Sequence, residues 1–300
     1  MTRHPQFGLW LALFGVLVLT PDAMFMRLSG MGPLEMLGWR GLLMGSVMIL
    51  AWAIFSGDRG RDLRVLASGY GLGAAACHCV NAALFSYGIG TAPVAMVVLG
   101  VATVPIFAAL LARLLMGTPT RRATWVAIAV VIAGIAVSVF GGGGRVSIDV
   151  AALRGVLVGL GVALALALNF VLFRARPDLP IPLVIGLGAA TAGTIGALTV
   201  GAGAMAEGRI WAIAICGAVI LPVSFFCMSL ASRHTQAANV SLLMLLEVVL
   251  APFWVWLVLD EAMTGAMLAG GLIVILGVGG YVLHTGRTGA AARRARALRG

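Results

Sequence analysis

Long apolar runs follow one another along almost the whole chain, and they restrict its fold more than any other feature. About 20 helical residues, at 1.5 Å each, cross the roughly 30 Å hydrocarbon core of a bilayer. Lipid cannot hydrogen-bond to backbone groups, so runs of this length are expected to be helices. We predict an all-α integral membrane protein with ten spans, at about residues 8–28, 33–56, 65–89, 93–116, 122–141, 150–173, 180–202, 209–231, 235–258 and 263–284.

Composition supports a membrane protein, because 61% of the 300 residues are hydrophobic and only 10% are charged. A soluble domain carries about 25% charged residues. The net charge of +10 comes from arginines scattered singly between apolar runs, a pattern that does not favour a nucleic-acid partner. The sequence contains no Walker loop and no ligand-spaced histidine pair, so we expect no cofactor, no metal and no enzyme activity. The four cysteines lie in apolar runs and are expected to be buried free thiols.

The arginines also predict the orientation, since short cytoplasmic loops carry an excess of basic residues. If both termini are cytoplasmic, the opposite side receives only Arg27, Arg145, Arg154 and Arg209, while Arg40 falls inside the second span. We therefore predict a multi-pass protein of the bacterial inner membrane, with a basic tail at 287–300 on the anionic leaflet. The arginines expected on the cytoplasmic side are Arg3, Arg59, Arg61, Arg64, Arg113, Arg121, Arg122, Arg174, Arg176, Arg233, Arg287, Arg293, Arg294, Arg296 and Arg299.

The chain resembles itself on either side of a glycine-rich stretch, which indicates an internal duplication. We predict a first repeat at 1–141, a linker at 142–149 and a second repeat at 150–286. Five spans per repeat is an odd number, so the second repeat must be inverted, as in many secondary transporters. The repeat pattern does not indicate an oligomeric state, and a monomer with its two repeats is a plausible transport unit. A shift of 147 pairs Gly8 with Gly155, Asp22 with Asn169, Arg27 with Arg174 and Pro33 with Pro180; a shift of 143 pairs Val131 with Val274 and Gly134 with Gly277.

Glu247 is the most informative single residue, because it is a carboxylate inside the apolar stretch Leu242–Leu259. An ionisable residue within a span is costly and is a functional-site hypothesis by default. Its counterpart in the first repeat is Val104, so the carboxylate belongs to one repeat only. Coupling, substrate binding or a single structural hydrogen bond would each explain it.

Glu247-Val248, the stretch Ala251–Glu261 and the later Thr264, Gly270 and Gly277 form a recognisable pattern. With them the chain resembles the drug/metabolite transporter superfamily, in its ten-helix EamA branch. The family pattern has Pro at the position of Val248, Gly at Asp260 and, in the first repeat, Glu at Thr118. The resemblance implies a secondary carrier of small metabolites, and characterised bacterial members are often amino-acid exporters.

Asp22 and Arg40 are predicted to pair. Thr20-Pro21-Asp22 predicts a kink with polar atoms in the first span, because proline removes a backbone hydrogen bond. Arg40 lies at a similar depth in the second span, counted at 1.5 Å per residue. The pair could hold two helices together, or it could gate the protein or contact a substrate.

Further cavity-lining candidates are His78 and Asn81 of the third span and Asn169, the repeat counterpart of Asp22. His78 and Asn81 are three residues apart and share a helix face. A histidine at the depth of Glu247 could assist proton coupling, or both could be neutral and hydrogen-bonded. Pro105, Pro222 and Pro252 are hinge candidates, or static bends, and Trp254 and Trp256 suggest an interfacial belt.

Together these features predict a secondary transporter that works by alternating access through a central cavity between the two repeats. Its expected partners are the bilayer, a small-molecule substrate and protons, and the expected substrates are exported amino acids, including aromatic or apolar ones. The alternative is a flippase of the same fold for lipid or lipid-linked substrates. A lateral groove open to lipid would favour the flippase, and a closed aqueous cavity would favour a soluble substrate.

Overall fold

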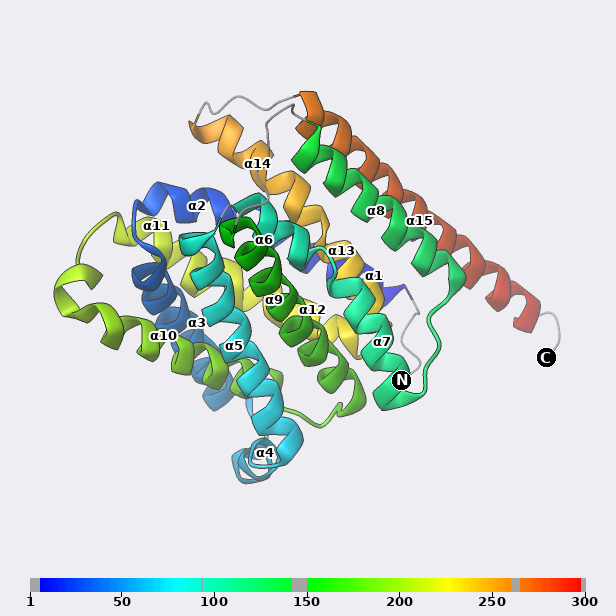
Figure 1. Cartoon of the computed structure of the whole chain (residues 1–300). Helices are drawn as coiled ribbons and strands as arrows, with labels where there is room; N and C mark the ends of the chain where they lie inside the picture. The colour runs from blue at the N-terminus through cyan, green and yellow to red at the C-terminus, as the bar shows by residue number, and fades with distance from the viewer. Residues whose placement is uncertain (1–5, 93, 142–149, 260–264, 298–300) are drawn as a thin grey trace.

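The computed structural model describes residues 6–92, 94–141, 150–259 and 265–297, and these ranges are helical without a strand (Figure 1). The all-α prediction is confirmed for them. The predicted linker at 142–149 and the Asp260-Glu261 pair lie outside the described residues. The helices are α1 (Phe7–Leu19), α2 (Asp22–Ser29), α3 (Pro33–Phe55), α4 (Arg59–Leu66), α5 (Gly69–Thr91), α6 (Val94–Val101), α7 (Val104–Met116), α8 (Arg122–Phe140), α9 (Val150–Ala175), α10 (Ile181–Met205), α11 (Ile210–Ile215), η1 (Cys216–Ile220), α12 (Leu221–Ser232), α13 (Ala237–Met244), α14 (Leu246–Leu259) and α15 (Gly265–Ala297).

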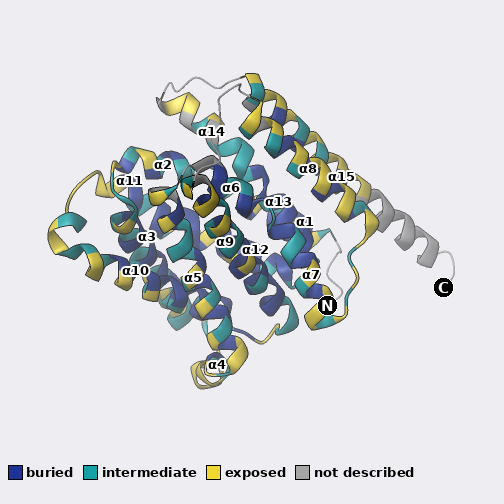
Figure 2. Cartoon of the chain, in the orientation of Figure 1, coloured by how far each residue is buried: buried dark blue, intermediate teal, exposed yellow. Residues whose placement is uncertain are grey.

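Seven helical stretches are long and apolar enough to cross a membrane, so this is a multi-pass membrane protein. The remaining predicted spans coincide with α5, α8 and α15, which are also helical. The number ten stays a prediction. Exposed hydrophobic side chains cover the outer helices, as lipid contact requires, and buried residues fill the middle of the bundle (Figure 2). The seven stretches are Phe7–Ser29, Pro33–Phe55, Met96–Met116, Leu153–Ala175, Ile181–Met205, Ile210–Ser232 and Ala237–Val258.

The first span breaks at Thr20-Pro21, as the sequence predicts, so α1 and α2 are separate helices. The Thr20 hydroxyl donates to the Leu17 carbonyl at 2.9 Å and accepts from the Trp254 indole N–H at 2.9 Å. Trp254 therefore anchors α14 to the break, whereas the sequence suggested an interfacial position for it. The repeat counterpart α9 has no proline at this point and continues unbroken.

The fourth span of each repeat is interrupted at equivalent positions. In the first repeat α6 ends at Val101 and α7 begins at Val104, with Pro105 in its first turn. In the second repeat the break falls at Leu245, which the shift of 143 pairs with Ala102. Pro252 lies inside α14, so the interruption that the sequence placed at Pro252 occurs seven residues earlier. Pro222 also begins a helix, after the π-helical turn η1, where the wider turn accommodates the proline ring.

The last helices of the two repeats, α8 and α15, lie side by side (Figure 1). A Cβ atom added at Gly134 would lie 2.9 Å from a Val274 methyl, and one added at Gly277 would lie 3.4 Å from a Val131 methyl. These are the residues that the shift of 143 pairs, so the contact is reciprocal, as in an isologous interface. Likewise α9 packs on α5 and α6, while α1 packs on α12 and α13.

The counterparts α3 and α10 pack against each other along much of their length. A Cβ atom at Gly41 would lie 2.5 Å from the Gly193 Cα, and one at Gly45 would lie 2.7 Å from the Ala190 Cβ. The backbones approach closely because the residues at the crossing are glycines and alanine, which carry at most one side-chain carbon. Such small-residue contacts replace the hydrophobic effect as the basis of helix association in lipid.

The connections gather at two opposite ends of the bundle. One end, which we call the arginine-rich end, is formed by α4, the α7–α8 and α9–α10 loops and the α12–α13 turn. There the Arg233 guanidinium donates to the Leu179 carbonyl, and the Gln236 amide donates to the Pro119 carbonyl. At the Gly30 end, formed by the α2–α3 and α10–α11 loops, the Arg209 N–H donates to the Ser29 carbonyl at 2.8 Å. Arg27 and Arg209 lie at the Gly30 end, away from Arg61, Arg64, Arg176 and Arg233, while the orientation of the two ends in the membrane stays a prediction.

Candidate functional site

A central cavity of about 690 Å³ lies between the two repeats. It extends to Gly30 and Met31 at the Gly30 end, and its described lining includes no residue of the arginine-rich end. Most of the lining is apolar. The polar and charged side chains that line it are Asp22, Arg27, Arg40, His78, Asn81, Ser86 and Glu247.

The predicted pair of Asp22 and Arg40 is present at the cavity wall. Arg40 Nη2 donates to Asp22 Oδ2 at 2.6 Å, and the side chains are only 12% and 5% exposed. The other terminal nitrogen of the Arg40 guanidinium, Nη1, contacts the Met26 sulfur. Asp22 begins α2, where the positive end of the helix dipole favours a carboxylate. Its other oxygen, Oδ1, is buried and has no hydrogen-bond partner among the described residues, so it can accept another donor.

Glu247 lies in the first turn of α14, directly after the break at Leu245. A new helix begins here, and the N-terminus of a helix favours an acidic side chain. Glu247 lines the same cavity as Asp22 and Arg40. Two carboxyl groups, each at the start of a helix, therefore face one cavity together with one paired arginine.

His78 and Asn81 line the same cavity from α5, so the prediction that they share a face is confirmed. Their exposed fractions are 3% and 8%. The His78 ring packs edge-on against Phe225, with ring centroids 5.1 Å apart. His78 Nδ1 has no hydrogen-bond partner among the described residues, so this nitrogen can still engage a ligand or a water molecule.

Asn169 does not line the cavity, contrary to the prediction from its counterpart Asp22. Its Nδ2 donates to the Ala74 carbonyl at 2.8 Å, and the residue is 1% exposed. The reason is that α9 is unbroken and packs along α5, which buries this position at a helix interface. Pro105 and Pro222 are predicted as hinges and not as lining residues, and their hinge role stays a prediction; Leu221, next to Pro222, does line the cavity. The side chain of Pro252 lies outside the described residues.

Methionines are the lining residues that the sequence did not reveal. An unbranched thioether chain adapts to ligands of different shape, so methionine suits a permissive binding surface. A single methionine in an apolar span carries no signal of its own, because lipid-facing and cavity-facing positions look alike. The cavity methionines are Met26, Met31, Met36, Met44 and Met244.

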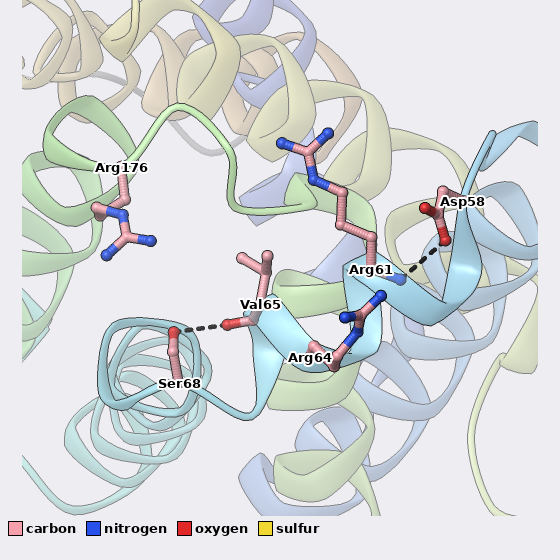
Figure 3. A pocket seen from close by; sticks show the side chains of 6 residues that line it. All are labelled: Asp58, Arg61, Arg64, Val65, Ser68 and Arg176. Carbon is pink, nitrogen blue, oxygen red and sulfur yellow. Dashed lines mark hydrogen bonds between the residues drawn. The ribbon is translucent and has the colours of Figure 1, made fainter.

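A second hollow, of about 430 Å³, lies at the arginine-rich end between α4 and the α9–α10 loop (Figure 3). Three arginines line it, Arg61, Arg64 and Arg176, with one acidic residue, Asp58. Arg176 pairs with Asp178 at 2.8 Å, whereas Asp58 caps α4 by accepting from the backbone N–H of Arg61 at 2.9 Å. The hydrogen bond from Arg176 lowers the pKa of Asp178. This hollow is smaller than the central cavity and is lined from one end of the molecule, so it is the weaker candidate for a transport site.

Comparison with known proteins gives one family. The model of the EamA-like transporter family matches residues 6–140 and again residues 153–283, one stretch in each repeat. A solved structure titled only "Crystal structure of protein" is 19% identical over 90% of this chain and 94% of its own, with a TM-score of 0.73, and so shares the fold. No curated protein matches the chain. The matched stretches cover most of the sequence and follow the two repeats described above, and the chain therefore belongs to the EamA-like transporter family, a family of membrane transporters within the drug/metabolite transporter superfamily.

Proposed function

We propose that this transporter carries small zwitterionic metabolites, foremost amino acids with apolar or aromatic side chains. The observation that carries this proposal is the pairing of opposite charges in a mostly apolar cavity. Arg40 offers a partner for a substrate carboxylate, while Asp22 and Glu247 offer partners for an ammonium group. Charge-assisted hydrogen bonds of this kind fix the orientation of a small ligand.

The remainder of the cavity fits the rest of such a substrate. Its volume of about 690 Å³ falls in the range of roughly 300–1,000 Å³ that is typical of small-molecule sites. Methionines together with Phe85 and Phe225 supply adaptable apolar surface for a side chain. This combination supports a carrier that recognises the zwitterionic group closely and the side chain loosely.

Alternating access is the proposed mechanism. The cavity extends to the Gly30 end and not to the arginine-rich end, and the helix breaks at Thr20-Pro21 and Leu245 border it. In the predicted orientation the Gly30 end is periplasmic, so this is an outward-facing state with both termini in the cytoplasm. Export would then load substrate at the arginine-rich end and release it through the present cavity.

Glu247 is also the group that we propose for proton coupling. A carboxyl group that binds either a proton or the substrate ammonium, but not both, links the two fluxes. His78, on the same cavity wall, can exchange a proton with bound water.

The test is counterflow of radiolabelled leucine and phenylalanine in proteoliposomes, with and without a pH gradient. Glu247→Gln should lower the rate about tenfold, since a lost hydrogen bond to a charged group costs roughly 1.5–3 kcal/mol, and should flatten the pH response. Glu207→Gln, which changes an exposed carboxylate in the α10–α11 connection, is the matched control. Unchanged rate and pH response in Glu247→Gln would refute this role. Movement of a fluorescent phospholipid, without amino-acid counterflow, would instead support the flippase alternative.

A further inference from the structure

The arginine-rich end is closed by a chain of buried hydrogen bonds that links both repeats. Thr124 of α8 and Tyr281 of α15 share a hydrogen bond of 3.0 Å between their hydroxyl groups. The Tyr281 hydroxyl donates to Asn239 Oδ1 at 2.6 Å, and Asn239 Nδ2 donates to Thr235 Oγ1 at 2.9 Å. All four residues are buried. The chain therefore reaches from the first repeat to the α12–α13 turn of the second.

Arg174, in the last turn of α9, holds the same turn from the other side. Its Nη1 donates to the Ser232 carbonyl at 3.3 Å and to the Thr235 carbonyl. These carbonyls follow or end α12, where backbone acceptors lack helical partners and the helix dipole is negative. The partners found for Arg174 among the described residues are thus carbonyl groups, and its Nε is buried without a hydrogen bond. Such an attachment can be released without separating two full charges.

The counterpart of Arg174 under the shift of 147 is Arg27, and it occupies the same place in its own helix. Arg27 lies in the last turn of α2 and lines the central cavity near the Gly30 end. One repeat therefore presents this arginine to a cavity, and the other repeat holds it against a closed end. In an inverted-repeat carrier the two halves exchange such conformations during the cycle.

We propose that Arg174 latches the arginine-rich end shut and that, once released, it lines the cavity entrance at that end, as Arg27 lines the present one. This inference rests on the proposed transporter function. When released, the guanidinium presents a positive charge at the entrance, where it attracts a substrate carboxylate. Asp22 has the neutral counterpart Asn169, so no acidic residue competes at the equivalent position. Arg174 is in this sense a positioning residue of the closed state and a recognition residue of the open one.

The test measures access to two reporter cysteines, each in a variant without the native cysteines. Ser232→Cys reports on the latched turn, where the native serine is 0% exposed, and Ser86→Cys reports on the present cavity. Each reporter is combined with Arg174→Gln, and the labelling rate with a membrane-impermeant maleimide is measured in detergent-solubilised protein. Arg176→Gln is the matched control, because it removes an arginine of the same loop region that binds Asp178 and not the α12–α13 turn.

Arg174→Gln should raise labelling of Ser232→Cys about tenfold, from the loss of one charge-assisted hydrogen bond, and should lower labelling of Ser86→Cys. Arg176→Gln should leave both rates unchanged. Equal rates in the two arginine variants would overturn the proposal. A rise at both reporters would also overturn it, because it would show general loosening and not an exchange of accessible ends. Labelling requires no substrate, so a latch that responds as expected while counterflow fails would refute only the proposed substrate class.

Discussion

Asp22 and Arg40 are held together in a cavity wall where neither is well hydrated, and this determines what their substitution should do. Removing one partner of a buried ion pair typically costs about 3–5 kcal/mol, because the other charge is left without compensation. The cavity gives this pair some access to water, which reduces the cost. The pair is nevertheless far less exposed than Arg176–Asp178, whose side chains are 38% and 29% exposed.

Arg40→Gln should therefore lower the free energy of unfolding by about 2 kcal/mol, while Arg176→Gln should lower it by at most about 1 kcal/mol, as for surface pairs. Thermal unfolding of the two variants in the same detergent measures the difference. The exchanged variant, Asp22→Arg with Arg40→Asp, should recover expression that either single change loses. Equal melting temperatures for the two glutamine variants would contradict the buried pairing.

At the scale of single residues, some predictions followed from helix geometry alone. The depth of Asp22 and Arg40, counted along two neighbouring spans, was enough to predict their contact. The shared face of His78 and Asn81 needed only the helical period. Asn169 could not be placed in this way, because whether a polar group faces a cavity or a neighbouring helix depends on the packing partner.

At the scale of elements, the breaks in the spans determine where the functional groups lie. Thr20-Pro21 places Asp22 at a helix start, and the break at Leu245 does the same for Glu247. Proline marks the first break but not the second, which lies at the same position in its repeat as the break before Pro105. The sequence could therefore locate one break from local chemistry, while the other depends on tertiary contacts around α13 and α14.

The close crossing of α3 and α10 gives a test of helix association. Gly41→Ala should lower the free energy of unfolding by about 1–3 kcal/mol, the usual cost of overpacking, because the new methyl group would meet Gly193 backbone atoms at 2.5 Å. Gly73→Ala in α5 is the control, since a Cβ atom there meets nothing within 4 Å. Alanine should be neutral or stabilising at that position, by up to about 1 kcal/mol. Melting temperatures in one detergent measure both effects, and similar destabilisation by both changes would contradict the close crossing.

At the scale of the whole molecule, the distribution of charge predicts the orientation in the membrane. The arginine-rich end gathers α4 and the basic loops, while Arg27 and Arg209 lie at the Gly30 end. A green fluorescent protein fused after residue 300 should fluoresce, and an alkaline phosphatase at the same point should be inactive, because both termini are expected in the cytoplasm. Active phosphatase in that fusion would reverse the assignment of outward-facing and inward-facing states.

Glu247 and the spans around it show where the sequence was sufficient and where it was not. The sequence by itself determined a helical membrane protein with two related halves, because each apolar run satisfies its own backbone hydrogen bonds and its length alone matches the bilayer. Only the tertiary structure decided which side chains share a cavity, which end is closed, and where α13 ends and α14 begins. The physical reason is that lipid-facing and bundle-facing surfaces are equally apolar, so the hydrophobic pattern does not specify how each helix is rotated. That rotation is set by backbone contacts such as Gly41 with Gly193 and by hydrogen bonds such as Arg174 with the α12–α13 turn.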